Sequence, residues 1–187
     1  MTPDYSFGDG VNACDADCQG LASLVHSLGA PRCVEVGAFI GKTANAMLAA
    51  GAVHVWSIDL WSGCPDLTGR TPWEKPWLIG PAHGRQVLER YCANVPIVTR
   101  ATPLVGASLD WARRWPGAQP IDLVFIDGNH DYEFCRDDVA AWTPLVRSGG
   151  IVCGHDFCDE CPGVKRAVEE SGPFEIVGLS VWWRTIR

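Results

Sequence analysis

Short apolar runs alternate with helix-forming segments along most of this 187-residue chain. Four of these runs are apolar enough to form strands that are buried on both faces of a sheet. They are residues 33–36, 52–58, 121–126 and 151–153. Because buried parallel strands are joined by helical crossovers, the pattern predicts an α/β protein with a doubly wound, mostly parallel sheet. A fifth strand within 95–105 and an antiparallel C-terminal hairpin over 174–177 and 181–186 make seven strands in all.

The chain is predicted to consist of an N-terminal cap and one α/β domain. The cap, residues 1–31, contains a polar arm and a helix over 18–28, for which Asp17 is the expected N-cap. Residues 32–187 hold the sheet and five further helices. These helices are predicted at residues 42–50, 81–93, 108–115, 132–142 and 164–170. With 47% hydrophobic residues, a domain of this length can bury a substantial core.

The segment from Arg32 to Thr43 has the order strand, glycine turn and helix. Gly37 opens the turn and Gly41 closes it, and the following residues are rich in good helix formers. In α/β sheets this arrangement holds nucleotide-like ligands, because glycines let the backbone approach and the helix N-terminus offers unpaired N–H groups. The spacing Gly-x-x-x-Gly matches neither the dinucleotide fingerprint nor a phosphate loop. The segment is therefore compatible with a ligand-binding loop and with an ordinary tight turn.

Acidic residues lie at the carboxyl ends of the predicted strands. Glu35 lies beside the glycine turn, and the others are Asp59, Asp127 and the pair His155–Asp156. In doubly wound sheets, ligands bind outside this edge, where the strand order reverses. A single strand-end aspartate is usually a turn or helix cap. Four strands that each bring a carboxylate to the same edge instead predict a functional site.

Composition excludes several kinds of partner. The formal net charge of −7 argues against nucleic acid or an anionic membrane, since either would require a basic face. No apolar run has the length of a membrane span, and the N-terminal residues do not resemble a signal peptide. Nine cysteines in such a chain indicate reduced thiols and a cytoplasmic location.

Residues 60–80 have no hydrophobic period but contain Trp61, Trp73, Trp77 and three prolines. A loop of this length in a compact domain is often a lid or a binding loop. A cluster of Trp and Pro that covers the edge of the sheet is the alternative.

Four stretches of the sequence resemble class I S-adenosylmethionine-dependent methyltransferases, in the O-methyltransferase-like branch that includes relatives of cephalosporin hydroxylase. They are Val34–Gly41 (VEVGAFIG), Trp56–Trp61 (WSIDLW), Asp122–Tyr132 (DLVFIDGNHDY) and Ser148–Phe157 (SGGIVCGHDF). The resemblance runs from about Arg32 to the C-terminus. The combination of the Asp-Gly-x-His stretch with the Gly-Gly…His-Asp stretch is its most specific part.

The resemblance implies that the cofactor is S-adenosyl-L-methionine. The implied cofactor-binding residues are Glu35, Gly37, Ala38, Gly41, Asp59, Leu60, Trp61, Ala107, Ser108 and Asp127. The glycine turn and the Glu35 carboxylate would face the methionine end with its ammonium group, and Asp59 would accept both ribose hydroxyls. Leu60 and Trp61 would flank the adenine. The family often has an acidic or polar residue where this chain has Ala107, so the contact with the adenine edge departs from the pattern.

The resemblance also implies two ways to activate an acceptor hydroxyl. His130 is the first candidate for the general base, because an unperturbed imidazole titrates near neutrality; a local role in the turn is the alternative. Related enzymes hold a divalent metal on strand-end carboxylates, and Asp127 and Asp156 with His155 would form such a site here, for Mg²⁺ or a similar ion. Many relatives have two acidic residues where this chain has His155–Asp156. Asp127 thus belongs to the catalytic, cofactor and metal sets.

Two cysteine pairs depart from the family pattern. Cys158 and Cys161 follow the last site strand with Cys-x-x-Cys spacing, and Cys14 and Cys18 lie in the N-terminal cap. This spacing suits zinc, and both segments could reach the same edge of the sheet, where His155 and Asp156 would allow a mixed site. Two unrelated pairs of surface thiols are the favoured alternative.

The sequence therefore predicts an enzyme that transfers a methyl group from S-adenosylmethionine to a hydroxyl of a small-molecule acceptor. A nicotinamide-dependent Rossmann oxidoreductase shares the acid at Asp59 but lacks its glycine fingerprint. A non-catalytic binding or assembly protein with Cys-bound zinc is the third alternative. The expected partner is a small molecule, with no nucleic acid and no membrane, and a homo-oligomer is compatible with the sequence.

Overall fold

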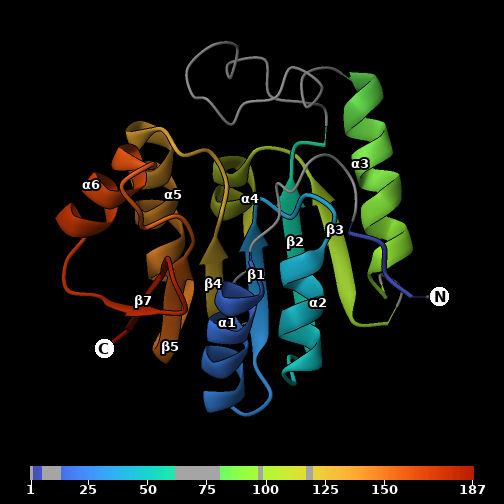
Figure 1. The fold of residues 1–187 in the computed structure, drawn as a ribbon. Coiled ribbons are helices and arrows are strands. Elements are labelled where there is room, and N and C mark those ends of the chain that lie inside the picture. Colours follow the sequence, from blue (N-terminus) through green and yellow to red (C-terminus); the bar gives the residue numbers. More distant parts are fainter. Residues whose placement is uncertain (1, 6–13, 62–80, 97–98, 117–119) are drawn as a thin grey trace.

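The computed structural model describes residues 2–5, 14–61, 81–96, 99–116 and 120–187, and within them a seven-stranded sheet in the order β3-β2-β1-β4-β5-β7-β6 (Figure 1). The strands are β1 (Arg32–Val36), β2 (His54–Asp59), β3 (Ala101–Val105), β4 (Ile121–Ile126), β5 (Val146–Gly154), β6 (Glu175–Val177) and β7 (Val181–Thr185). β1 to β5 pair in parallel, whereas β7 pairs antiparallel with both β5 and β6. The predicted fold class, a doubly wound sheet with a C-terminal antiparallel hairpin, is confirmed.

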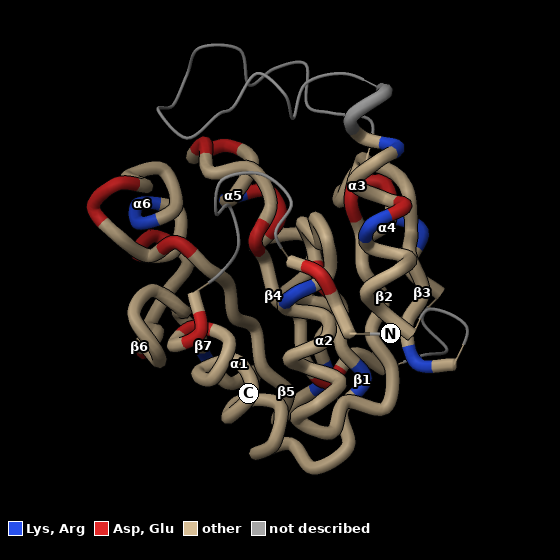
Figure 2. The backbone as a smooth tube through the Cα atoms, turned by 45° about the vertical axis from the view of Figure 1, so that its right-hand side comes forward, with Lys and Arg blue, Asp and Glu red and all other residues tan. Residues whose placement is uncertain are grey.

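Helices cover both faces of the sheet (Figure 1). They are α1 (Asp15–Ser27), α2 (Lys42–Ala49), α3 (Pro81–Asn94), α4 (Ser108–Arg114), α5 (Tyr132–Trp142) and α6 (Pro162–Glu170), and the 3-10 helix η3 spans Thr143–Leu145. α1, α2 and α3 pack on one face around residues such as Leu21, Met47 and Tyr91. α4, α5 and α6 pack on the other around residues such as Val139 and Trp142. Most of the strand backbone carries no charged side chain (Figure 2), as expected for strands that are covered on both faces.

The last parallel strand is longer than its sequence predicts. β5 begins at Val146, five residues before the predicted start, and it includes the Ser148-Gly149-Gly150 segment. The register shifts here, because Ile121 pairs with Val146 while Leu123 pairs with Ile151. Backbone hydrogen bonds join Gly149 and Gly150 to Ile186. The glycines therefore form an irregularity within the strand, which neighbouring strands stabilise.

The predicted N-cap of the first helix is wrong. α1 begins at Asp15 after Cys14, and Asp17 lies inside the helix with only 4% of its surface exposed. Its Oδ1 accepts hydrogen bonds from the backbone N–H groups of Leu179 (2.7 Å) and Ser180 (2.9 Å), between β6 and β7. Asp17 therefore attaches the first helix to the C-terminal hairpin, a contact that no local pattern around it indicates.

Two predictions made from composition, on membrane spans and on cysteines, can be compared with the described residues. No helix among them is long and apolar enough to cross a membrane. The eight cysteines that the structure describes are all free thiols, of which Cys33, Cys135 and Cys153 are buried as small core residues. The Trp-rich loop predicted over residues 60–80 lies outside the described part of the chain from residue 62 onward.

Candidate active site

The carboxyl ends of four neighbouring strands form one edge of the sheet. The strand order reverses between β1 and β4, which is where doubly wound sheets bind their ligands. Backbone hydrogen bonds continue the parallel pairing just past the strand ends: Gly37 N–H donates to Ile58 O, and Asp127 N–H donates to Val36 O, both at 2.8 Å. These bonds fix the first residues of the loops. We call this edge, with the side chains described below, the strand-end rim.

The glycine turn is required by the protein's own backbone. Gly37 has a φ of 86°, and a Cβ atom there would lie 1.9 Å from the carbonyl oxygen of Asp127. Gly41 has a φ of 83°, and its Cβ would lie 2.3 Å from the side chain of Val95. Glycine at both positions is thus needed before any ligand is considered. The turn also brings the loops after β1 and β4 into direct contact, with Ala38 buried between its glycines.

Glu35 lies beneath the turn and is completely buried. One carboxylate oxygen accepts a hydrogen bond from the Thr43 hydroxyl, and the other accepts one from the Ser57 hydroxyl at 2.7 Å. Burial raises the pKa of Glu35 to about 8, although the two hydroxyls lower it. The structure therefore places Glu35 inside a polar network under the rim, and its contact with a methionine ammonium stays a prediction.

Asp59 organises the backbone on the other side of the turn. Its Oδ2 accepts the N–H of Phe39 and its Oδ1 accepts the N–H of Trp61, each at 2.9 Å. The backbone N–H groups of Ala38 and Leu60 also bond to this carboxylate, and its contact with the ribose hydroxyls stays a prediction. Burial raises the pKa of Asp59 and the backbone N–H groups oppose this.

The two residues predicted to flank an adenine lie in different environments. Leu60 is 38% exposed at the rim, whereas Trp61 is only 6% exposed. The Trp61 indole N–H donates to the Phe39 carbonyl at 3.0 Å, and its ring packs on Tyr91 at 5.1 Å between centroids. Trp61 therefore stabilises the glycine turn from inside the core.

Ala107 and Ser108 stand at the start of α4. Ala107 is exposed and is the N-cap residue, but its side chain makes no capping hydrogen bond. The Ser108 hydroxyl accepts the Trp142 indole N–H at 2.8 Å, so it serves the packing of α4 against α5. Of these two residues, only Ala107 is exposed.

Asp127, His155 and Asp156 come together as predicted for a metal site. The His155 Nδ1 lies 3.1 Å from the Asp156 Oδ1 and 3.7 Å from the Asp127 Oδ1. One ligand atom from each of the three residues lies within 4.8 Å of the other two. Two carboxylates and an imidazole form a donor set that a divalent cation accepts, with the nitrogen making it less selective for Mg²⁺ than an all-oxygen set.

The rim imposes unusual protonation on its carboxylates. Burial raises the pKa of Asp127 to about 6, and repulsion by Asp156 adds to this, while His155 opposes it. Burial also opposes ionisation of Asp156, but hydrogen bonds from His130 and His155 hold the pKa of that carboxyl well below its usual value. One carboxylate is therefore firmly ionised, and its neighbour titrates close to neutrality.

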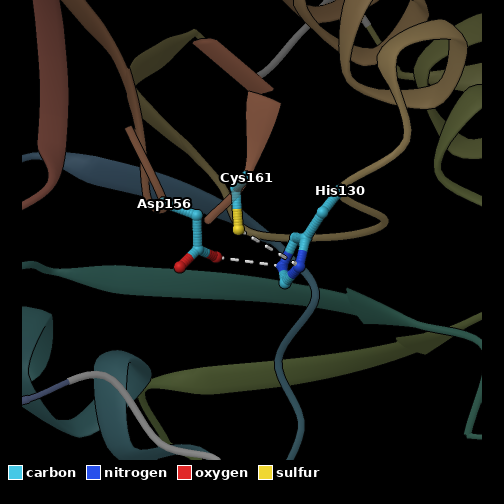
Figure 3. A group of neighbouring side chains, drawn as sticks. All are labelled: His130, Asp156 and Cys161. Atoms are coloured by element: carbon cyan, nitrogen blue, oxygen red, sulfur yellow. Dashed lines mark hydrogen bonds and ion pairs between the residues drawn. The ribbon is translucent and has the colours of Figure 1, made fainter. Parts of the chain in front are cut away.

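His130 lies between a carboxylate and a thiol. Its Nε2 lies 2.9 Å from the Asp156 Oδ2, and its Nδ1 lies 3.9 Å from the Cys161 Sγ (Figure 3). Burial disfavours the imidazolium, but Asp156 and Cys161 raise the pKa of His130 to about 11. In this state of the rim a buried carboxylate stabilises the protonated ring, and the role of His130 as the general base stays a prediction.

One member of the rim cluster was not predicted from the sequence. Asp17 reaches His155 from α1, with its Oδ2 3.1 Å from the His155 Nε2. Cys161 joins His130 and Asp156 as a third potential ligand. No signal near Asp17 indicates its role, whereas the Cys-x-x-Cys spacing did mark Cys161. The four-cysteine zinc site is not assembled, because neither cluster of potential ligands among the described residues contains Cys14 or Cys18.

Backbone strain marks the same edge. The described non-glycine residues with a left-handed φ are Phe39 (44°), Trp61 (40°) and Asp156 (60°). They follow β1, β2 and β5, and each lies within three residues of a strand end. Conformations of this kind cluster at functional sites.

Known proteins share this architecture. A protein described as a putative O-methyltransferase from Klebsiella pneumoniae has a TM-score of 0.67 at 16% identity, with 96% of this chain and 84% of that chain covered. TomG, an O-methyltransferase from Streptomyces achromogenes solved with SAM, has a TM-score of 0.66 at 15% identity over 95% and 82%. An O-methyltransferase from Bacillus cereus solved with SAH has a TM-score of 0.64 at 16% identity over 96% and 84%.

At such low sequence identity, the likeness to these structures establishes the fold alone. A match to a family model identifies the family. The model described as "Methyltransferase domain" matches residues 34–157, which is more than half of the chain. The match extends from the glycine turn through the strand-end rim to Asp156. The resemblance to class I methyltransferases is confirmed, and the chain belongs to the methyltransferase domain family.

Proposed function

We propose that the protein transfers a methyl group from S-adenosylmethionine to a hydroxyl group of a small molecule. The observation that carries the proposal is the strand-end rim, where a glycine turn and Asp59 lie on one side and Asp127, His155 and Asp156 on the other. Family membership and the O-methyltransferases of the same fold support it. A nicotinamide-dependent oxidoreductase would need a different glycine fingerprint.

The residues of the strand-end rim would have separate roles in the reaction. S-adenosylmethionine supplies an electrophilic methyl group on a sulfonium, which is already a good leaving group. Asp59 would bind the ribose and Glu35 the ammonium, and the glycine turn would permit close approach. The polar side chains after β4 and β5 would orient the acceptor hydroxyl and receive its proton.

A small acceptor suits the charge of the chain. The net charge of −7 gives no electrostatic attraction for a phosphate backbone. Both acidic and basic positions occur on α6 beside the rim (Figure 2), a mixed surface unlike the basic face of a nucleic-acid protein. TomG and the Bacillus cereus protein are named as O-methyltransferases, which favours oxygen as the accepting atom here.

Replacing Asp59 with alanine is expected to weaken S-adenosylmethionine binding by about 30- to 150-fold, because a carboxylate contact to two hydroxyls contributes about 2–3 kcal/mol. Isothermal calorimetry on the purified protein measures this directly. Asp110→Ala is the matched control, since Asp110 is exposed on α4 and pairs with Arg113. Unchanged affinity in Asp59→Ala would remove Asp59 from the binding site. If the wild type binds no cofactor at millimolar concentration, the chain is a non-catalytic member of its family.

Cofactor binding at pH 7 is expected to release close to one proton if Glu35 receives the ammonium. With a pKa of about 8, Glu35 is mostly protonated in the free protein, and pairing with a cation would lower that pKa. Calorimetry in buffers with different ionisation enthalpies reports the number of protons. Glu35→Gln should bind without release. Equal proton release by wild type and variant would show that Glu35 does not meet the ammonium.

Methyl transfer is expected to depend on a divalent cation held by Asp127, His155 and Asp156. Such a cation lowers the pKa of a bound hydroxyl. Chelator should abolish turnover and Mg²⁺ or Mn²⁺ should restore it, while Asp127→Asn and Asp156→Asn should lose it; Asp156→Asn should keep most cofactor affinity.

Metal binding by the cofactor-free protein gives a test that needs no acceptor. Titration with Mn²⁺, followed by paramagnetic relaxation, should show one site that is lost in Asp127→Asn and kept in Asp122→Asn. Activity that resists chelator but loses its acidic limb in His130→Ala would assign the base to His130 and contradict the metal.

A further inference from the structure

His155 lies between carboxylates on both sides of its ring. Its Nε2 lies 3.1 Å from the Asp17 Oδ2, while its Nδ1 lies 3.1 Å from the Asp156 Oδ1 and 3.7 Å from the Asp127 Oδ1. Asp17 comes from α1, whereas the other two carboxylates follow β5 and β4. Only 12% of the His155 side chain is exposed. The ring therefore connects the N-terminal helix with the carboxylates of the strand-end rim.

The Asp17 carboxylate is held in place mainly by donors from the C-terminal hairpin. Its Oδ1 accepts the backbone N–H groups of Leu179 at 2.7 Å and Ser180 at 2.9 Å. Its Oδ2 accepts the Ser180 hydroxyl at 3.2 Å and the Cys14 thiol at 3.1 Å. With 4% of its surface exposed and both oxygens bonded, Asp17 has little freedom to turn away from His155.

The partners of Asp17 determine which nitrogen of His155 carries a hydrogen. N–H, O–H and S–H donors surround the carboxylate, so it acts as an acceptor toward the ring as well. The Nε2 therefore carries a hydrogen and donates it to the Asp17 Oδ2. On the opposite side, the Nδ1 faces two carboxylates, where either a proton or a divalent cation can join the three groups. A cation that binds there takes the place of the proton and uses the Nδ1 lone pair.

We propose that Asp17 is a positioning residue, which accepts the Nε2–H of His155 and thereby directs the Nδ1 lone pair toward a cation held with Asp127 and Asp156. A carboxylate that accepts the other ring N–H is the usual partner of a metal-bound histidine, because it fixes the ring and the position of its hydrogen. The inference rests on the metal dependence proposed above. It gives the N-terminal helix a part in the site, although Asp17 lies outside residues 34–157, which the family model matches.

Asp17→Asn separates the positioning role from the attachment of α1 to the hairpin. The backbone N–H groups of Leu179 and Ser180 keep the amide oxygen at the place of Oδ1, so the amide NH₂ faces His155. That NH₂ donates to Nε2, and the ring hydrogen moves to Nδ1. The variant is expected to bind Mn²⁺ about 10- to 100-fold more weakly than the wild type, as followed by paramagnetic relaxation. Asp15→Asn is the matched control, because it removes the same charge from the same helix at a side chain that is 88% exposed, and it should keep the wild-type affinity.

The ring nitrogens of His155 give a second measurement, which requires no cation. Long-range ¹H–¹⁵N correlation spectra of the full chain at neutral pH distinguish a nitrogen that carries a hydrogen from one that does not. His155→Gln identifies the signals of this ring by their absence. The Nε2 should carry a hydrogen in the wild type and in Asp15→Asn, and none in Asp17→Asn. The wild-type spectrum tests the hydrogen bond to Asp17 even if Asp17→Asn fails to fold.

The results distinguish failure of this inference from failure of the proposed function. A wild-type Nε2 without a hydrogen, or equal Mn²⁺ affinity in the wild type and Asp17→Asn, would overturn the role of Asp17 and leave the metal site in place. An equal loss of affinity in Asp15→Asn would assign the effect to charge alone and also contradict the inference. Absence of Mn²⁺ binding by the wild type would overturn the metal site itself, and the positioning role with it.

Discussion

Gly37→Ala is expected to destabilise the protein by more than about 4 kcal/mol, enough to leave most of the chain unfolded. The added Cβ would lie 1.9 Å from the Asp127 carbonyl oxygen, which is backbone and cannot rotate away. The loops after β1 and β4 would have to separate, and the hydrogen bond from Asp127 N–H to Val36 O would be lost. Both loops carry the strand-end rim, so any residual folded protein should also lose cofactor binding.

Gly29→Ala is the matched control for this substitution. Gly29 has nearly the same φ, 83° against 86°, but a Cβ there would meet nothing within 4 Å. Its replacement should lower the free energy of unfolding only by the energy of holding an alanine in the left-handed conformation, about 1–2 kcal/mol. Urea unfolding of both variants separates the two effects. Equal losses in Gly37→Ala and Gly29→Ala would mean that the contact with Asp127 relaxes freely.

Stability is expected to fall as the pH rises from about 4.5 to about 8 because of Glu35. The pKa of this buried carboxyl is raised in the folded state to about 8, whereas in the unfolded chain it stays near 4.5. Between these values the unfolded state releases the proton first, so rising pH favours unfolding, and above pH 8 no further loss occurs. The full shift corresponds to roughly 3–5 kcal/mol.

Glu35→Gln should remove this pH dependence. The amide keeps the shape of the side chain and can bond to Thr43 and Ser57, but it does not ionise. At pH 8 to 9 the variant is therefore expected to be more stable than the wild type by roughly 3–5 kcal/mol, while the two should be similar near pH 5. Glu89→Gln, at an exposed position on α3, is the control. Parallel stability curves for wild type and Glu35→Gln across this range would contradict the raised pKa.

The strand-end site could be predicted because it depends on position alone. Asp127 and Asp156 each follow a strand of the sheet, and the order of parallel strands brings such residues together whatever their side chains do. Side-chain environments were harder to predict. Trp61 turns into the core and the His130 ring pairs with a carboxylate, because each has a partner from another loop, Phe39 for Trp61 and Asp156 for His130. The sequence next to Trp61 or His130 does not indicate which residue of another loop will be its partner.

The cysteine pairs show a similar limit. Cys-x-x-Cys spacing marked Cys158 and Cys161, and the sequence offered Cys14 and Cys18 as companions because they too form a closely spaced pair. The structure instead places the Cys161 Sγ beside His130, 31 residues away. Such a neighbour is set by the packing of α6 on the loop after β4 and leaves no signal in the spacing of the cysteines.

The attachment of Asp17 to Leu179 and Ser180 also affects the order in which the chain folds. These bonds join residues 162 and 163 positions apart, so they close a loop of almost the entire sequence, at a large entropic cost. During synthesis, α1 emerges before this hairpin, and until the hairpin forms, the Asp17 carboxylate has only local partners such as the Cys14 thiol at 3.1 Å. His155 receives its contact from Asp17 only at that stage. We therefore expect the sheet to be largely assembled before the rim has its native geometry.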